Sequence, residues 1–454
     1  MAANEPSSLL LEIPLHIVAH ILCQLDSISQ LHDAVLSHSI FHAAFQDNTY
    51  STIGSILTNR IPLDILPFAL ALLKSGRIAK RDTEAGLRLL RQLKTTILDP
   101  SIATSSILEL SISDAAQISR DYEAVQFLIK DLVEETIPVL NERLEVNHPP
   151  DISAQERVRL NRAFFRYQLM CNLLCRRYDL QALDDKITET FFEAFSPWVN
   201  AQLACVYGYL ERKVGEAFDD VAAHDVGYGE LPVYWNEKDN AYLQEFLSCG
   251  LPFLGSVIRA RSFDERIDLL DLSLFKARSW DCWPCAQLQK MDPDEEHPEI
   301  EIMVPTHTRR DDLSQLSQPL DEKHDAAGSG PSQTWLSSHF DNGFMYPMFD
   351  DEDRNLWECG YAFWDSNETG EMTRSWEEWK KIRALPRHFQ RQFDWPWEEM
   401  LQSQKQRADI WLAGGGGYWP RDGFDFGKIQ GLKEEDKERL LSRWRAQGGK
   451  SQDS

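Results

Sequence analysis

Two cysteines near the middle of the chain have the spacing of a redox or metal site. Cys282 and Cys285 enclose a Trp-Pro pair in the motif CWPC, and in thioredoxin-like enzymes the second thiol of such a motif resolves a disulfide formed at the first. That chemistry requires a strand before the motif and a β-α-β context after it. Here the sequence predicts helices before the motif, and an acidic stretch follows it. A zinc site would need four ligands, and the chain has no second Cys-x-x-Cys. We therefore expect two buried, reduced thiols and keep a thiol-redox enzyme based on Cys282 and Cys285 as an alternative.

Two histidine pairs near the N-terminus have the spacing of zinc ligands on one helix face. His16 and His20 are four residues apart, as are His38 and His42. A zinc-protease helix would carry glutamate directly after the first histidine, and the residue there is Ile17. No serine-histidine-aspartate order, dinucleotide fingerprint or kinase motif is present either. We expect no metal, no catalytic residue and no cofactor, and we expect that the chain is not an enzyme.

Composition restricts the class of protein further. The chain has 454 residues, a length typical of two to four domains, and a formal net charge of −25. Such an acidic chain lacks the clustered lysine and arginine that neutralise nucleic-acid phosphates. No run reaches the roughly 18 uncharged apolar residues of a membrane helix. Eight cysteines in so long a chain do not form a disulfide framework, which predicts reduced thiols and a place in the cytoplasm or nucleus.

Apolar residues recur at helical spacing over most of the chain, which predicts a mostly α fold. We divide it into an N-terminal three-helix unit (1–50), a multi-helix body (51–286), an acidic and polar disordered linker or insertion (287–334) and an aromatic C-terminal region packed on the body (335–454). Ten of the fourteen tryptophans lie in the last region. There the segment LWECGYAFWD, which starts at Leu356, has the bulky residues of a strand or a buried extended piece.

Four aromatic residues of that region lie in turn-rich segments and are the candidates for substrate contact. Trp395 and Trp397 flank a proline, and Tyr418-Trp419 precedes another. Tryptophan and tyrosine are enriched at binding hot spots. Such side chains are also the largest core residues, so core and binding surface stay open as alternatives, and these four are the best candidates for exposure.

The first helix of the N-terminal unit is the clearest element of the chain. Ile17, Val18, Ile21, Leu22 and Leu25 fall on one broad arc of a helix, with histidines on its edge. Two further short helices follow before residue 46. Helices this short depend on tertiary packing, and so much apolar surface in a small unit predicts that part of it meets a partner.

This stretch resembles the F-box, a degenerate motif that covers about residues 10–47 here. Ile13-Pro14 stands for the family's Leu-Pro, His16 occupies its usual acidic position, and Phe41 stands where tryptophan is frequent. The resemblance implies the substrate receptor of a cullin–RING ubiquitin ligase, which binds the ligase's adaptor protein through the F-box and an unknown protein substrate through the rest. By position, the residues that would contact the adaptor or form the core beneath it are Ile13, Pro14, Ile17, Ile21, Leu22, Leu25, Leu31 and Phe41. The alternative is a helical interaction scaffold or regulator that acts without a ligase.

Overall fold

The fold is almost entirely helical. The computed structural model describes residues 13–79, 82–144, 152–175, 185–230, 240–270, 282–289, 316–326, 328–340, 354–365, 395–421 and 424–448. It is 76% helical, which confirms the predicted mostly α fold. Within the described ranges the strands are two short ones, β1 (Gly416–Gly417) and β2 (Ile429–Gln430), paired antiparallel. None of the described helices combines the length and the apolar character needed to cross a lipid bilayer.

The helices follow one another along the chain with short connections. Those of the N-terminal part are α1 (Leu15–Leu22), α2 (Ile28–Ser37), α3 (Ser39–Asp47), α4 (Thr49–Arg60), α5 (Leu66–Ser75), α6 (Thr83–Leu98), α7 (Pro100–Ile107), α8 (Ile112–Leu144) and α9 (Ala154–Met170), continued by the π-helical turn η2 (Cys171–Cys175). The later ones are α10 (Asp185–Glu193), α11 (Pro197–His224), the 3-10 turn η3 (Val226–Glu230), α12 (Ala241–Leu247), α13 (Leu251–Arg259), α14 (Phe263–Leu269), α15 (Pro284–Gln289), α17 (Glu322–Asp325), α18 (Gly330–Phe340), α19 (Arg354–Glu358), α21 (Trp397–Leu412) and α22 (Glu434–Gly448).

Helix ends are set by local sequence. At α9, the Ser153 hydroxyl accepts a hydrogen bond from the Glu156 N–H, and the Glu156 carboxylate accepts one from the Ser153 N–H. This reciprocal capping box satisfies two N–H groups that the first turn of a helix leaves without partners. At α6, the Asp82 carboxylate accepts from the Ala85 N–H. In both caps the two residues are three positions apart in the sequence.

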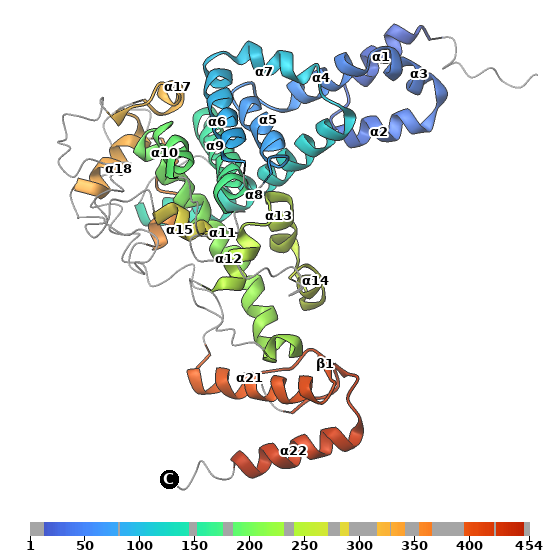
Figure 1. Ribbon diagram of the computed structural model, residues 1–454, viewed down its shortest axis with the longest axis vertical. Coiled ribbons are helices and arrows are strands. Elements are labelled where there is room, and N and C mark those ends of the chain that lie inside the picture. Colours follow the sequence, from blue (N-terminus) through green and yellow to red (C-terminus); the bar gives the residue numbers. More distant parts are fainter. Residues whose placement is uncertain are drawn as a thin grey trace, which may run out of the picture.

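The core is built around α9 and α11, which lie side by side inside the body (Figure 1). Helices α5, α8, α13 and α19 pack around these two. Nearly every residue of α11 is buried, including polar ones such as Asn200 and Gln202. A helix buried on all sides must satisfy its polar side chains internally, and the Asn200 amide donates to the carbonyls of Phe192 and Phe195.

A buried ionic cluster fastens residues 316–326 to these central helices. The Asp325 carboxylate lies 3.1 Å from Arg159 Nε and 2.7 Å from Arg162 Nη2, and these three side chains are almost completely inaccessible to solvent. The Asp321 carboxylate accepts from the Ser196 N–H at 2.6 Å, which caps the first turn of α11. Buried charges are stable only when paired and hydrogen-bonded in this way.

Part of the region predicted as a polar linker is therefore core. Leu320, Asp321, Asp325 and Trp335 are buried. Disorder was predicted because carboxylates and small polar residues predominate in the segment 287–334. The structure differs for residues 316–326 and 328–334: buried arginines of α9 pair with the Asp325 carboxylate, and Ser196 donates to Asp321. The part between 290 and 315 lies outside the described residues.

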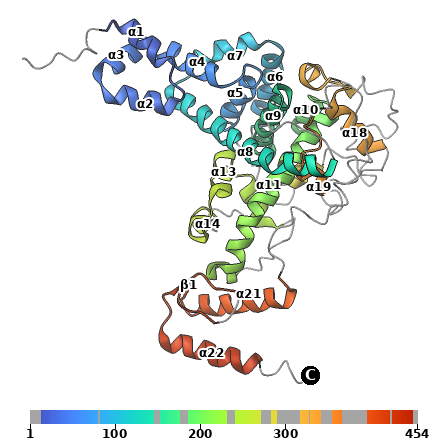
Figure 2. The same cartoon turned by 180° about the vertical axis from the view of Figure 1, so that it is seen from behind.

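The C-terminal helices form a separate small cluster at the end of α11 (Figures 1 and 2). Helix α21 packs on η3, and Trp419 and Trp444 lie at the centre of its apolar core, together with Val226 of η3. The run of four glycines at residues 414–417 contains β1. A Cβ at Gly417 would come within 2.5 Å of the Lys428 carbonyl oxygen, so only glycine permits this close strand pairing.

The segment LWECGYAFWD is buried but is not a strand. It begins as α19 and turns at Gly360, whose φ of +62° ends the helix in the left-handed region. The Trp364 indole N–H then donates to the Cys359 carbonyl at 2.9 Å. No neighbouring strand is present in the described part of the chain to pair with these residues, so packing against α11 decides their conformation.

Candidate functional site

Helix α1 has one apolar face buried in the core and another that is exposed to solvent. Val18 and Leu22 are buried in the core, whereas Ile17 and Ile21 are 42% and 50% exposed. Pro14, three residues before Ile17, is exposed as well. Residues at this spacing share one face of a helix. Pro14, Ile17 and Ile21 thus form an apolar strip on the surface, which we call the α1 strip.

The eight residues named by the F-box resemblance separate into three levels of burial. Three are exposed, three are half-buried against the core and two are buried. In that order they are Pro14, Ile17 and Ile21; Ile13, Leu25 and Phe41; Leu22 and Leu31. The exposed three are available to a partner, and the other five hold the helix that presents them.

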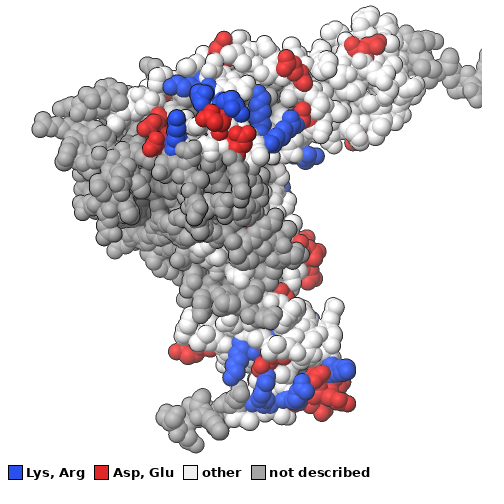
Figure 3. Space-filling view, viewed as in Figure 1, with Lys and Arg blue, Asp and Glu red and all other residues white. Residues whose placement is uncertain are grey.

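The surroundings of the α1 strip carry little charge. Residues 13–47 include three carboxylates and no lysine or arginine. Figure 3 shows few charged side chains over this end of the molecule, whereas the body beside it is mixed in charge. Depletion of charge around exposed apolar side chains is typical of the centre of a protein–protein interface.

The histidines of this unit have structural or solvent-exposed positions. The His38 ring Nδ1 accepts from the Ile40 N–H at 3.2 Å and so caps α3. His16 and His20 are exposed on α1. Among the described residues there is no group of three or more histidine, cysteine or acidic side chains that could hold a metal ion.

The three-helix unit is anchored to the body through α4 and α8. Helix α2 contacts α8, and α1 and α3 contact α4. The Asn59 amide of α4 donates to the Cys23 carbonyl at the end of α1, at 3.3 Å. The α1 strip is therefore presented by a fixed helix at one extremity of the molecule (Figures 1 and 2).

The CWPC cysteines are buried at the start of α15. Cys282 and Cys285 are almost inaccessible, and the Cys285 N–H donates to the Gln244 Oε1 of α12. Cys171 and Cys175 are buried too, one helical turn apart in the core. A nucleophilic thiol must be reachable by its substrate, so the burial of Cys282 and Cys285 gives the redox alternative no support.

Two of the four aromatic candidates for exposure are buried. The Trp419 N–H donates to the His224 carbonyl at 2.8 Å, and its indole donates to Gln406. Trp395 packs edge-on against the His224 ring. Tyr418 is half-buried, stacked on the same ring, and Trp397 is 51% exposed. The predicted exposure is wrong for Trp395 and Trp419, because the loop folds onto the end of α11.

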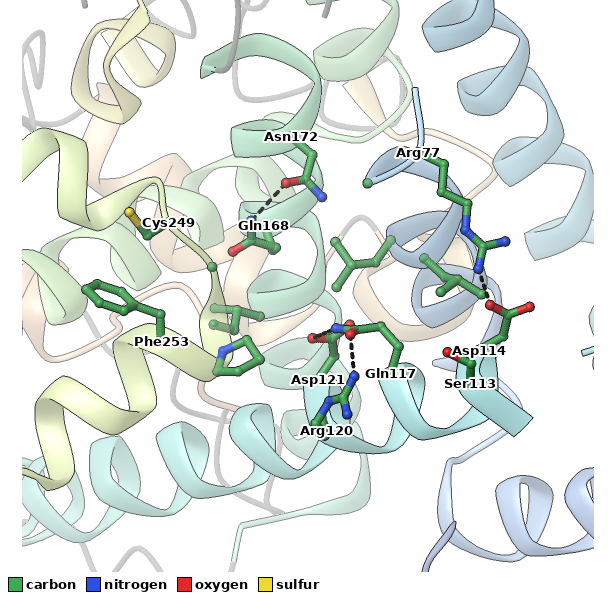
Figure 4. Close-up of a pocket in the computed structure, with 16 residues that line it drawn as sticks. Arg77, Ser113, Asp114, Gln117, Arg120, Asp121, Gln168, Asn172, Cys249 and Phe253 are labelled. Atoms are coloured by element: carbon green, nitrogen blue, oxygen red, sulfur yellow. Dashed lines mark hydrogen bonds and ion pairs between the residues drawn. The ribbon is translucent and has the colours of Figure 1, made fainter. Parts of the chain in front are cut away.

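A cleft on the body is the second candidate site (Figure 4). It has a volume of about 530 Å³ and is bounded by α5, α8, the end of α9 with η2, and the start of α13; we call it the α8–α9 cleft. Its apolar lining comes from Leu72, Leu73, Leu251, Pro252 and Phe253. Its volume lies in the range of about 300–1,000 Å³ typical of small-ligand sites.

Two carboxylates of α8 in this cleft differ in their environment. Asp121 is 6% exposed, and burial raises its pKa to about 6, although a hydrogen bond from Gln117 and the charge of Arg120 act against the rise. For Asp114 burial also favours the neutral form, but hydrogen bonds from Ser111 and Arg77, with the charge of Arg77, hold its pKa below the usual value. A strongly perturbed acid in a cleft marks a candidate for function.

The opposite side of the cleft contains a buried acceptor without a donor. Gln168 is 4% exposed; its Nε2 donates to Asn172 Oδ1 at 3.1 Å, but its Oε1 has no partner in the described part of the chain. The Asn172 Nδ2 donates onward to the Ser75 hydroxyl at 2.8 Å. A buried oxygen without a donor costs free energy, and this one is shielded from the open space of the cleft.

Sequence reasoning did not identify this cleft. Its polar residues come from helices that are distant in sequence, and only folding brings them together. One indication was available: Asp121 lies at helical spacing from Ile118 and Val125, and Gln168 from Phe164 and Cys171, all of them apolar. A polar residue on an apolar helix face must have a specific partner or a ligand.

No protein-family model, no curated protein and no solved structure matches this chain. Its function must therefore be argued from its own residues.

Proposed function

We propose that the chain is the substrate receptor of a cullin–RING ubiquitin ligase and binds the ligase's adaptor protein through the α1 strip. The observation that carries the proposal is the exposure of Ile17 and Ile21 on a helix whose other face is buried. Ile17 and Ile21 lie one turn apart and are about half exposed, so covering the rest of each side chain with a partner should contribute about 0.7–1.5 kcal/mol. The order Ile-Pro followed by a short apolar helix supports the F-box assignment.

A receptor of this kind needs no catalytic residue. It brings a bound substrate close to the ubiquitin-conjugating enzyme and so raises the effective concentration of the reacting lysine. The arrangement suits this role, because α1–α3 lie at one extremity of the molecule, away from the C-terminal cluster of α21 and α22 (Figures 1 and 2).

The test is co-purification of the full chain with the adaptor protein. Changing Ile17→Asp and Ile21→Asp places two charges on the strip without entering the core, so we expect adaptor recovery to fall at least 100-fold while the helical circular dichroism stays unchanged. The matched control is Leu98→Asp, which puts a charge at a 57% exposed leucine of the body and should leave recovery unchanged. Equal recovery of wild type and the double variant would contradict the proposal.

A helical scaffold or regulator that acts without a ligase is the second candidate. His16, at the position where the F-box usually has an acid, favours it, as does the lack of a matching family model. In that case wild type would recover no adaptor although it is folded. The α1 strip would then serve a different protein partner.

A further inference from the structure

Helix α21 of the C-terminal cluster has a mostly polar side turned inward and an apolar side turned to solvent. The residues of this helix that are buried are Ser403, Gln406, Arg407 and Ile410. Its large apolar residues that remain exposed are Trp397 at 51%, Leu401 at 41%, Trp411 at 44% and Leu412 at 76%. A helix on the surface of a globular protein normally has the opposite arrangement. The exposed side of α21 therefore has the composition of a face that another protein covers.

The exposed apolar residues of α21 follow the spacing of a coiled-coil seam. Steps of three and four residues alternate in such a seam, which keeps its members on one side of the helix. In α21 the residues at these steps are Trp397, Leu401, Gln404, Ala408 and Trp411. Gln404 and Ala408 are half-buried, and Leu412 follows Trp411 at the edge of the same side. We call these six residues the α21 seam; it runs from the first residue of the helix to the last.

The apolar area of the α21 seam is close to what one partner contributes to a stable interface. A fully exposed side chain of this size has roughly 200 Å² of surface, so the four exposed residues together present about 400 Å². A specific interface covers about 800 Å² on each partner, and a little more than half of that area is non-polar. The seam therefore has the extent of a protein–protein interface.

A second copy of the chain fits the α21 seam. In a parallel, in-register pair each seam residue meets its own counterpart, so the tryptophans of the two copies face one another, which is a favourable contact. The small side chain of Ala408 permits close approach of the two helices. The Gln404 amide has both a donor and an acceptor and can bond with the same amide of the second copy, and a single polar residue in a seam sets its register.

The position of Lys405 favours the parallel orientation over the antiparallel one. Lys405 is exposed at the edge of the seam, next to the midpoint of α21. In an antiparallel pair centred on the seam the two Lys405 ammonium groups would lie opposite one another and repel. In the parallel pair Lys405 faces Met400 of the second copy instead. Acidic and basic residues are nearly equal in number in α21 and α22, so the negative charge of the chain is not concentrated at this surface (Figure 3).

We propose that the chain forms a parallel homodimer through the α21 seam. The seam and the α1 strip lie at different extremities of the molecule (Figures 1 and 2), so the pairing takes place away from the α1 strip. A dimer presents two copies of every binding surface, which raises the avidity for a multivalent partner. This inference does not depend on adaptor binding by the α1 strip.

The first experiment is sedimentation velocity of the full chain over a range of concentrations. Because an interface of this size is at the lower end of stable ones, we expect monomer and dimer to be equally populated at about 10–100 μM. Leu401→Asp places a charge within the seam and should weaken dimerisation at least 100-fold while the helical circular dichroism stays unchanged. The matched control Leu108→Asp puts a charge at a 51% exposed leucine of the body and should leave the dimer unchanged. A wild-type chain that stays monomeric over this range, or a Leu401→Asp variant that dimerises like wild type, would overturn the proposal.

A cysteine cross-link tests the parallel register. Ala408→Cys places one thiol in the seam, and in the parallel pair the two thiols meet within reach of a disulfide. In an antiparallel pair centred on the seam they would be separated by about 10 Å along the helix axis, at about 1.5 Å per residue. We expect oxidation to convert Ala408→Cys, but not wild type, into a covalent dimer on a non-reducing gel, and the added change Leu401→Asp should abolish this product. An Ala408→Cys dimer that does not cross-link would overturn the parallel pairing.

Discussion

Replacing Asp121 by asparagine should stabilise the protein at neutral pH. Burial raises the pKa of this carboxyl from 3.8 to about 6, so keeping it ionised in the fold costs about 3 kcal/mol above that pH, at about 1.36 kcal/mol for each pKa unit. Asparagine avoids this cost and still accepts the hydrogen bond from Gln117. Because its amide N–H groups also need partners, we expect a net gain of about 1–3 kcal/mol in the free energy of unfolding.

The gain should depend on pH in a defined direction. The folded-state pKa is raised, so the cost is absent below about pH 4, where Asp121 is protonated in both states, and it develops as the pH rises toward 6. Urea unfolding followed by circular dichroism at pH 4 and pH 8 measures this. Asp121→Asn should exceed wild type in stability at pH 8 and match it at pH 4.

Two variants on the same helix serve as controls. Glu123→Gln should change stability by no more than about 0.5 kcal/mol at either pH, as expected of a partly exposed ion pair. Asp114→Asn should lower stability at pH 8, because the pKa of Asp114 is depressed and its contribution is lost only as the pH falls. An Asp121→Asn variant less stable than wild type at pH 8, or equally stabilised at both pH values, would refute the reasoning.

Two further predictions concern the core. Asp325→Asn should lower the free energy of unfolding, measured by urea titration, by about 3–5 kcal/mol, because it leaves the buried charges of Arg159 and Arg162 uncompensated. A change below about 1 kcal/mol would show that this ionic cluster does not hold the segment 316–326. Trp419→Ala should lower the stability of the C-terminal cluster by about 3–5 kcal/mol and so raise the rate of amide hydrogen exchange in α21 and α22 but not in α9. An equal rise throughout the chain would show that the C-terminal cluster does not open separately.

Helical periodicity predicted the elements of the fold but not all of their surroundings. The start of α9 is local in origin, since its capping box joins Ser153 and Glu156, which are neighbours in sequence. The same reasoning was misleading for the segment around Asp325, where low hydrophobicity suggested disorder. The Asp325 carboxylate is buried in the core because arginines more than 160 residues away in the chain neutralise it. Local composition gives no information about a partner at that distance.

The two candidate sites differ in how many of their residues could be predicted from the sequence. The α1 strip follows from one short stretch, and its residues were named in advance; the tertiary structure then separated the exposed Ile17 and Ile21 from the buried Leu22. The α8–α9 cleft was not anticipated, because Asp121 and Gln168 come from different helices and acquire their shared surroundings only when these pack.

The sequence by itself determined that the chain is helical and which short stretch has more apolar surface than it can bury. These properties depend on residues a few positions apart, and local geometry suffices to derive them. Tertiary structure decided which side of α1 faces solvent, which tryptophans are hidden and which carboxylates are buried. Burial depends on contacts between residues far apart in the chain, and the same side chain has a different free energy in water, beside an opposite charge or in an apolar cleft.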